Sequence, residues 1–203
     1  MSSHQGLRPL VGDDHGHYKI AIVGNSGTGK STLSAHLAEL LNLPTLSLDH
    51  VHWNPGWVET PKDDFKDQVQ QFMDAHPDGW VIDGNYMSHI GPIVQDAATD
   101  ILWLDPPLLL NFWRIMLRTF GRMLGYTPQC APGCDESLTS VFASSDSILL
   151  WCLTHHHVQR TRNIPKWERQ CAEKGEGKWR RFDGWGSSLD AWLAWLNEDI
   201  KSA

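Results

Sequence analysis

The sequence predicts an α/β fold in three layers, with helices on both faces of a parallel sheet. Five short apolar runs alternate with stretches of helical periodicity, as in a chain of βαβ units. The first run leads into a glycine-rich loop and then a helix, and aspartate closes four of the five runs. With 203 residues, 41% of them hydrophobic, the chain has enough apolar side chains for one compact domain.

Each apolar run has the length and the continuous hydrophobicity of a strand that is buried on both faces. The predicted strands cover residues 20–23, 45–48, 80–82, 101–104 and 179–182. Ligands of open α/β sheets bind beyond the carboxyl ends of the strands, which makes Asp49 and Asp83 candidates for a site. Asp105 and Asp183 follow two other strands, where we interpret them as caps of the next turn or helix.

The stretches between and after the strands predict five helices. They cover residues 31–41, 61–74, 107–124, 146–162 and 187–197. Residues 125–145 are rich in Gly, Pro, Ser and Cys and interrupt the alternation, so we expect a lid insertion at about 125–162. The polar residues 1–17 predict a disordered leader, which leaves 18–203 as a single domain.

The clearest motif lies between the first strand and the first helix. It has the form Gly-x-x-x-x-Gly-Lys-Ser, the phosphate-binding P-loop in its strand–loop–helix context. Glycines let the backbone curl until several N–H groups face the phosphate oxygens, and the helix start adds its positive dipole end. Lys30 would reach the outer phosphates of ATP. The predicted nucleotide-binding residues are Gly24, Asn25, Ser26, Gly27, Thr28, Gly29, Lys30, Ser31 and Thr32.

Oxygen-bearing side chains around this motif predict a Mg²⁺ site. The Ser31 hydroxyl is a direct metal ligand in the P-loop pattern. Asp49 and Asp83 are both candidates to hold metal-bound water, and Asp49 is also a candidate to orient an acceptor hydroxyl or to act as its base. We therefore predict metal ligation by Ser31 and Asp83 and a catalytic role for Asp49 with Lys30.

These residues resemble the adenylate kinase-like P-loop kinases, and most closely the group of DNA topology modulation proteins of the FlaR type. The resemblance covers about residues 18–165. Besides the P-loop, it rests on the block from Leu48 to Trp57, on Trp80 to Tyr86, on Leu104-Asp105-x-Pro107 and on Gly133-Cys134. It implies a P-loop NTPase of the nucleoside monophosphate kinase-like type, with a five-stranded parallel sheet, a lid and ATP-dependent phosphoryl transfer.

Arginines after the fourth strand are candidates to contact the phosphates. Arg114, Arg118 and Arg122 recur every four residues on one helical face, which alone indicates a solvated basic stripe. The resemblance implies instead that Arg114 and Arg118 contact the donor phosphates. Arg160 and Arg162 follow the insertion, where lid kinases supply arginines that close on the transferred group, so we include Arg160 among the predicted catalytic residues.

The acceptor side departs from the family pattern. Adenylate kinases usually follow their Asp-Gly pair with an arginine that grips the acceptor phosphate, whereas Asn85 and Tyr86 stand here. Between Asp49 and Asp105 the only cations are lysines, so aromatic and polar side chains suit a ring or polyol better than a phosphomonoester. The predicted acceptor-binding residues are Asp49, His52, Trp53, Trp57, Asp83, Asn85 and Tyr86.

Composition bears on nucleic-acid binding, membrane spanning, localisation and zinc binding. The net charge of −7 disfavours nonspecific nucleic-acid binding, and no apolar run approaches the ~20 residues that span a bilayer. Four cysteines without a secreted-type framework favour the cytosol. Cys130 and Cys134 with His155, His156 and His157 are poorly spaced for zinc, which favours a lid with free thiols.

The sequence thus predicts a cytoplasmic phosphotransferase that uses ATP and Mg²⁺ and acts on a small-molecule or nucleotide-like acceptor. The alternative from another class is a P-loop NTPase that binds or hydrolyses nucleotide and acts as a regulator through a protein or DNA partner. Both predictions place the nucleotide at the P-loop. They differ in whether the residues beyond the second and third strands bind an acceptor.

Overall fold

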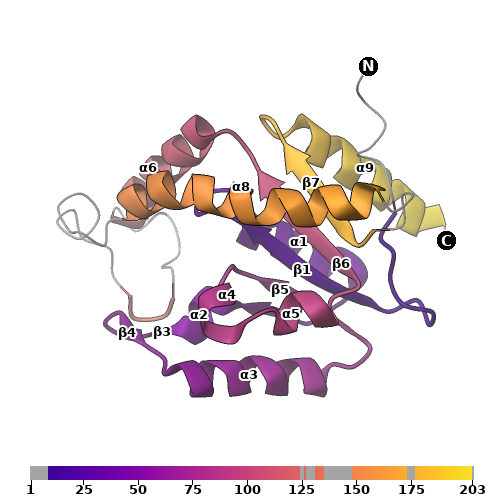
Figure 1. Cartoon of the computed structure of the whole chain (residues 1–203), viewed down its shortest axis with the longest axis horizontal. Helices are drawn as coiled ribbons and strands as arrows, with labels where there is room; N and C mark the ends of the chain where they lie inside the picture. Colours follow the sequence, from indigo (N-terminus) through magenta and orange to yellow (C-terminus); the bar gives the residue numbers. More distant parts are fainter. Residues whose placement is uncertain (1–8, 124–125, 127–130, 135–147, 173–176, 203) are drawn as a thin grey trace.

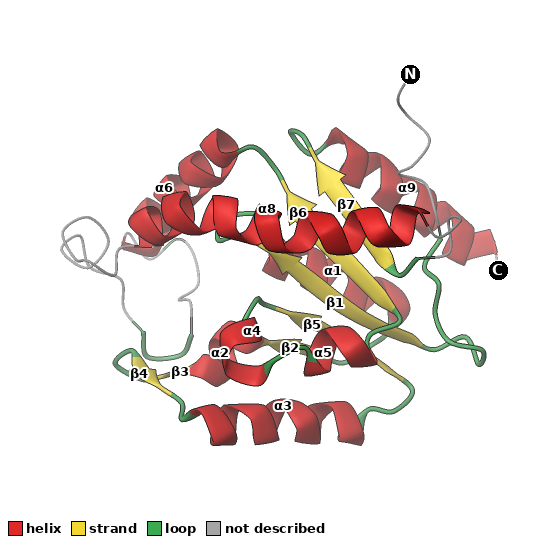
Figure 2. Ribbon diagram, in the orientation of Figure 1, coloured by secondary structure: helices red, strands yellow, loops and turns green. Residues whose placement is uncertain are grey.

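The computed structural model describes residues 9–123, 126, 131–134, 148–172 and 177–202. Its centre is a five-stranded parallel sheet, as predicted, in the order β2-β5-β1-β6-β7 (Figure 2). The strands are β1 (Tyr18–Gly24), β2 (Thr45–Ser47), β5 (Gly79–Asp83), β6 (Asp100–Asp105) and β7 (Trp179–Asp183). Because β1 lies between β5 and β6, the loop that follows it opens at the middle of the sheet edge.

Helices cover both faces of this sheet and complete the three predicted layers (Figure 1). One face carries α1 (Lys30–Leu41) and α9 (Ser187–Ser202), and the other carries α3 (Lys62–Ala75), α4 (Met87–Ile90), α5 (Ile93–Ala97) and α8 (Ile148–Ala172). The helix α6 (Leu108–Met123) follows β6 and packs beside α8.

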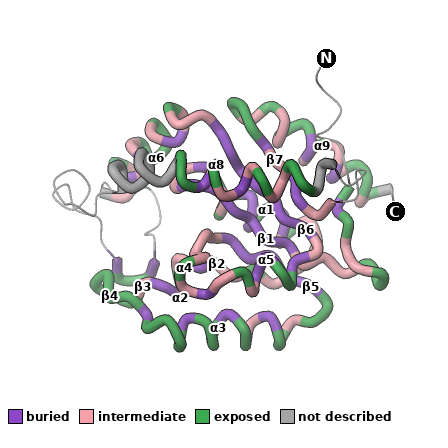
Figure 3. The backbone as a smooth tube through the Cα atoms, viewed as in Figure 1, coloured by how far each residue is buried: buried purple, intermediate pink, exposed green. Residues whose placement is uncertain are grey.

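The alternation of side chains along each strand divides the core between the two faces. In β1, Ala21 and Val23 pack with α3, α4 and α5, whereas Ile20 and Ile22 pack with α1 and α9. Both sets are at most 3% exposed, and the strands form the buried centre of the molecule (Figure 3). A sheet covered on both sides requires strands that are apolar throughout, which explains why the sequence showed continuous apolar runs.

Several elements differ from the sequence prediction. The fourth predicted helix continues to residue 172 although it contains Pro165, because Ile164 and Trp167 pack against the core beneath it. Leu48, expected to close the second strand, instead begins the short helix α2 (Leu48–His52). The two-stranded hairpin β3 (Trp53–Asn54) and β4 (Val58–Glu59), together with α4 and α5, is too short to show a periodicity.

Part of the expected leader is ordered against the sheet. Leu10 is buried, and the backbone N–H groups of Val11 and Gly12 donate to the carboxylate of Asp100 at 2.8 and 3.1 Å. Residues 10–12 therefore contact the sheet within the stretch expected to be a disordered leader, whereas residues 1–8 lie outside the described part of the chain. Within the described ranges, no helix has the length and apolarity that crossing a membrane requires.

Candidate active site

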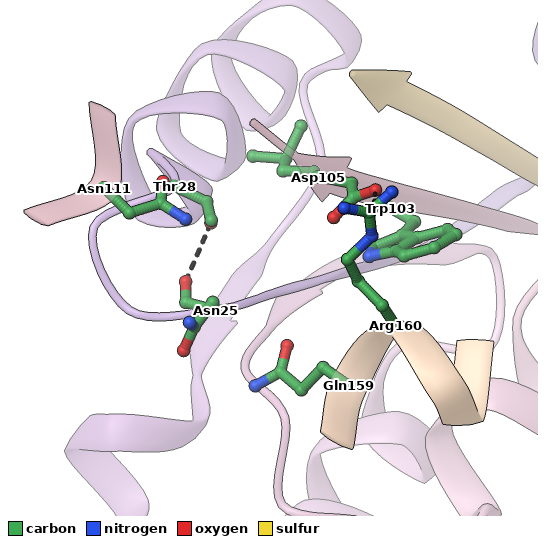
Figure 4. Close-up of a pocket in the computed structure, with 8 residues that line it drawn as sticks. Asn25, Thr28, Trp103, Asp105, Asn111, Gln159 and Arg160 are labelled. Carbon is green, nitrogen blue, oxygen red and sulfur yellow. Dashed lines mark hydrogen bonds and ion pairs between the residues drawn. The ribbon is translucent and has the colours of Figure 1, made fainter. Parts of the chain in front are cut away.

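The P-loop lies between β1 and α1 and is held in place by its own side chains. Lys30 Nζ and Thr28 Oγ1 both donate to the carbonyl oxygen of Asn25, each at 2.9 Å. Figure 4 shows the contact between Thr28 and Asn25. Gly27 has φ 76°, and a Cβ there would lie 2.7 Å from the carbonyl oxygen of Asn111 in α6. Only glycine fits this position, where the loop curls directly beneath the helix.

The start of α1 carries no side-chain cap. Its N-cap residue is Gly29, which has no side chain and a left-handed conformation, so no cap bonds the first N–H groups of the helix. Such a helix end attracts phosphate through its donors and its dipole. Ser31 and Thr32, in the first turn, are exposed. The predicted nucleotide-binding residues thus form the loop after β1 and the first turn of α1, at the carboxyl edge of the sheet.

Ser31 and Asp83 are brought together from adjacent strand ends. Ser31 Oγ donates to Asp83 Oδ2 at 3.0 Å, across 52 residues of sequence. Asp83 is only 2% exposed, and this burial raises its pKa, while the positive charge of Lys30 opposes the rise. A hydroxyl and a carboxylate beside a phosphate site are the oxygen ligands that Mg²⁺ takes in proteins, so the residues present fit this ion.

The predicted acceptor-binding residues gather beyond β2 and β5. Tyr86 Oη donates to Asp49 Oδ1 at 2.7 Å, and the His52 ring lies 4.6 Å from that of Tyr86. Trp53 and Trp57 stack edge to face at 5.4 Å in the hairpin that follows. His52 is 3% exposed, and this burial lowers its pKa. The structure therefore groups Asp49, Tyr86 and His52 tightly, with the two tryptophans at the rim.

The arginines reach different parts of this edge. Arg114 Nη1 donates to the Thr28 carbonyl of the P-loop at 3.3 Å, and Arg118 follows one turn later in α6. Arg160 Nε lies 3.4 Å from Asp105 Oδ2. Arg162, which the sequence left undecided, donates from Nη2 to Asn85 Oδ1 at 2.8 Å. The acceptor side thus contains a cation after all, and it comes from α8.

A pocket beside the P-loop contains polar residues that sequence reasoning missed (Figure 4). Asn111 of α6 and Gln159 of α8 line it together with Asn25, Asp105 and Arg160. Both amide atoms of Asn111 and the Oε1 atom of Gln159 are buried with no hydrogen-bond partner in the described part of the chain. Buried amides are normally bonded, so these atoms are exceptions among the described residues. The signal in the sequence that could have identified them is a polar residue on the inward face of an apolar helix.

Other predictions fall on residues that the structure does not fully describe. Cys130 lies outside the described residues, as do most of residues 124–147, so the expected lid at 125–162 is described only in part. Cys134 is buried and its thiol lies 3.3 Å from the carbonyl oxygen of Asn54. His155 and His156 belong to α8, but their side chains are not described. Zinc binding by these groups stays untested.

Comparison with solved structures identifies the fold. The chain resembles a shikimate kinase from Bacteroides thetaiotaomicron at a TM-score of 0.51 and 12% identity, over 90% of this chain and 97% of that one. It also resembles a shikimate kinase from Acinetobacter baumannii in complex with shikimate, at 0.51 and 15%, over 92% and 94%. No family model and no curated protein matches the sequence. The predicted nucleoside monophosphate kinase-like P-loop fold is thereby confirmed.

Proposed function

We propose that this protein is a Mg·ATP-dependent phosphotransferase that moves the terminal phosphate of ATP to a hydroxyl group of a small acceptor. One relationship carries the proposal: the Ser31–Asp83 contact and the Asp49–Tyr86 contact lie at neighbouring strand ends. Ser47 at the end of β2 is in register with Asp83 at the end of β5, and Asp49 follows Ser47 by two residues. A donor phosphate and an acceptor hydroxyl would meet between them.

The donor half uses the P-loop and the two helices above it. Lys30 and the N–H groups at the start of α1 bind the phosphates, and Arg114 and Arg118 neutralise charge from the α6 side. Ser31 and Asp83 would hold Mg²⁺, which would supply charge neutralisation for the phosphates.

The acceptor half uses the residues beyond β2 and β5. Asp49 accepts the proton of the attacking hydroxyl, and the Tyr86 hydroxyl orients the carboxylate for this task. Arg162 stands at Asn85 and stabilises the charge that develops on the transferred group, a part for which Arg160 is the second candidate. The aromatic rim of Trp53 and Trp57 suits a ring or polyol. Shikimate kinases are named among the structural neighbours, which supports a hydroxylated acceptor.

Purified protein tests this proposal against a nucleotide-dependent regulator. We expect a panel of sugars, polyols, ring hydroxy acids and nucleosides to include an acceptor that gains phosphate in step with ADP formation. The Lys30→Ala variant should lose this activity and the stabilisation by a nonhydrolysable ATP analogue, whereas Lys66→Ala on the exposed side of α3 should keep both. ATP consumption that rises only with DNA or a protein partner would overturn the phosphotransferase proposal and support the regulator.

The finer assignments belong to the same proposal. We place the protein in the cytosol on the strength of its cysteine content, and we retain the resemblance to the adenylate kinase-like and FlaR-type kinases as the nearest family interpretation. The missing arginine after Gly84 separates the chain from adenylate kinases in its acceptor choice. Replacing nucleoside monophosphates by polyols or ring hydroxy acids in the acceptor panel tests that separation directly.

A further inference from the structure

Three side chains with metal-binding atoms converge behind the acceptor residues. They are His52 of α2, Glu59 of β4 and His89 of α4. One ligand atom from each lies within 4.8 Å of the other two. The group is made of two imidazoles and one carboxylate and draws on three separate elements. His52 is also a predicted acceptor-binding residue, but Glu59 and His89 have no role in the phosphotransferase proposal, and none of the three side chains belongs to the P-loop or to the Ser31–Asp83 pair.

The backbone around the cluster is fixed by hydrogen bonds. The Thr60 N–H donates to the His52 carbonyl at 2.8 Å, and Thr60 Oγ1 donates to the Val51 carbonyl at 2.7 Å. These bonds hold Glu59 beside the end of α2, where it also pairs with Trp53 across the hairpin. The backbone position of Glu59 near the two histidines is therefore set by the fold, and rotation of its exposed side chain can bring the carboxylate closer to the imidazoles.

His52 is placed as a metal ligand usually is. Its side chain is 3% exposed, and its Nδ1 atom is buried without a hydrogen-bond partner among the described residues. Rings surround it, with centroids at 4.5 Å for Trp53, 5.6 Å for Phe65 and 4.9 Å for His89. A buried polar atom in an aromatic cage calls for a partner, because nothing else offsets the loss of its hydration.

A histidine that binds a metal is usually oriented by a hydrogen bond to its other ring nitrogen, and His89 has such a contact. Its Nδ1 atom lies 3.0 Å from Ser88 Oγ, which leaves Nε2 for an ion. Burial also lowers the pKa of His52 and so favours the neutral imidazole, the form that binds metal. Two imidazoles and a carboxylate match zinc-type ions and leave a fourth position open, whereas Mg²⁺ prefers oxygen ligands. The cluster thus differs in chemistry from the Mg²⁺ site at Ser31.

We propose that His52, Glu59 and His89 bind one divalent transition-metal ion of the zinc type. The ion would join α2, the β3–β4 hairpin and α4, and so hold the wall that carries Tyr86 and Asp49. This site goes beyond the phosphotransferase proposal and needs neither ATP nor an acceptor. A failure to bind metal would leave the phosphotransferase proposal untouched, and the absence of phosphotransfer would leave the metal site untouched.

Titration of the full-length chain tests the site. The protein is first freed of metal with a chelator, and Co²⁺ is then added while the visible absorption of low-symmetry Co²⁺ is followed; zinc is added afterwards to displace it. The variants are His89→Gln and Glu59→Gln. The matched control is His50→Gln, which removes an exposed histidine of the same helix α2 that lies outside the cluster. Thermal unfolding with and without zinc is measured on each protein.

We expect wild type and His50→Gln to bind one equivalent of Co²⁺. His89→Gln should bind the ion at least about 100-fold more weakly, since even the loss of an outer-shell partner lowers metal affinity 10–100-fold. Glu59→Gln should weaken binding in the same direction, and its exposed position keeps the fold intact if His89→Gln is unstable. Zinc should raise the unfolding temperature of wild type and of the control only. Equal titrations for wild type and both cluster variants, or an equal loss in His50→Gln, would overturn the proposal.

Discussion

Arg162 donates from Nη2 to the side-chain oxygen of Asn85 at 2.8 Å, and so joins α8 to the loop after β5. Two residues earlier in the same helix, Arg160 lies 3.4 Å from Asp105 at the end of β6. Because β5 and β6 flank β1 on either side, the two arginines stand on opposite sides of the P-loop. One helix thus brings cations to both the acceptor side and the pocket side of the site.

This arrangement predicts unequal roles for the two arginines. Arg162→Met should lower kcat about 10²–10³-fold, the effect of removing one preorganised charge partner from a transition state. Arg160→Met should lower it less, because Arg160 is paired with Asp105 and Arg181 also donates to that carboxylate at 2.9 Å. Steady-state kinetics at saturating ATP measures both. Arg162→Lys, which keeps the charge, should restore part of the rate, and a larger loss in Arg160→Met would contradict the assignment.

Asp83→Asn should lower the phosphotransfer activity and raise the stability of the protein. The variant would lose the proposed Mg²⁺ ligand, so phosphotransfer should fall below about 1% of wild type, within the range for removing a group that stabilises transition-state charge. Burial raises the pKa of Asp83, which means that its ionised form costs folding free energy. Removing that charge at neutral pH should raise the free energy of unfolding by about 1 kcal/mol, the scale of a single stabilising substitution. Denaturant unfolding measures the change.

The stability difference between Asp83→Asn and wild type should depend on pH in a definite direction. Because the pKa of Asp83 is higher in the folded than in the unfolded state, the folded state holds the extra proton between the two values. The contribution of Asp83 to stability is therefore fully present below the unfolded pKa and is lost as pH rises through the folded pKa. The advantage of Asp83→Asn over wild type should shrink as pH falls. Asp67→Asn on the exposed side of α3 is the control, and a gap that widens in acid would be the wrong sign.

Tyr86→Phe tests the acceptor half without touching the donor half. The substitution removes only the hydroxyl that donates to Asp49 Oδ1 at 2.7 Å, while the ring keeps its contacts with His52 and Phe65. We expect kcat/KM for the acceptor to fall about tenfold, because a hydrogen bond to a charged group is worth about 1.5–3 kcal/mol and part of it is replaced by water. KM for ATP should stay within about twofold. A change confined to ATP binding would contradict the role given to Tyr86.

The fold was predictable because its signals are local. Five apolar runs marked the five strands, and the glycines of residues 24–31 marked the loop between β1 and α1. The hairpin at Trp53–Glu59 and the continuation of α8 beyond Pro165 were not predictable in the same way. The strands of the hairpin are too short to show a repeating hydrophobic pattern, and the continuation of α8 depends on packing of Trp167 against a core that is distant in sequence.

The grouping of the candidate site residues was predictable where one segment carries its own chemistry. Ser31, Asp83, Asp49 and Tyr86 lie in motifs at strand ends, and the sheet brings such ends together. Long-range pairings were not accessible, because nothing local links Arg162 with Asn85, 77 residues away. The buried amides of Asn111 and Gln159 were missed for the same reason, since their burial depends on how α6 and α8 meet over the P-loop.

A buried ion pair at the opposite edge of the sheet leads to a prediction about stability. Arg180 Nη1 lies 2.5 Å from Asp100 Oδ1, and the two side chains are 8% and 0% exposed. The same carboxylate accepts the N–H groups of Val11 and Gly12 and the hydroxyl of Thr99. Arg180 also donates to the carbonyl oxygen of Pro9. Asp100 therefore joins the N-terminal segment to β6 and β7 at a single point.

Asp100→Ala should destabilise the protein by about 3–5 kcal/mol, because it leaves the guanidinium of Arg180 buried without its countercharge. For a chain of this length that corresponds to a fall in Tm of roughly 6–20 °C. The exposed control Asp78→Ala, whose side chain is 86% exposed, should change stability by less than about 0.5 kcal/mol. In the double variant with Arg180→Met the uncompensated charge is gone, so its loss should be smaller than the sum of the two single losses. Strictly additive losses would show that the two charges do not act as a pair.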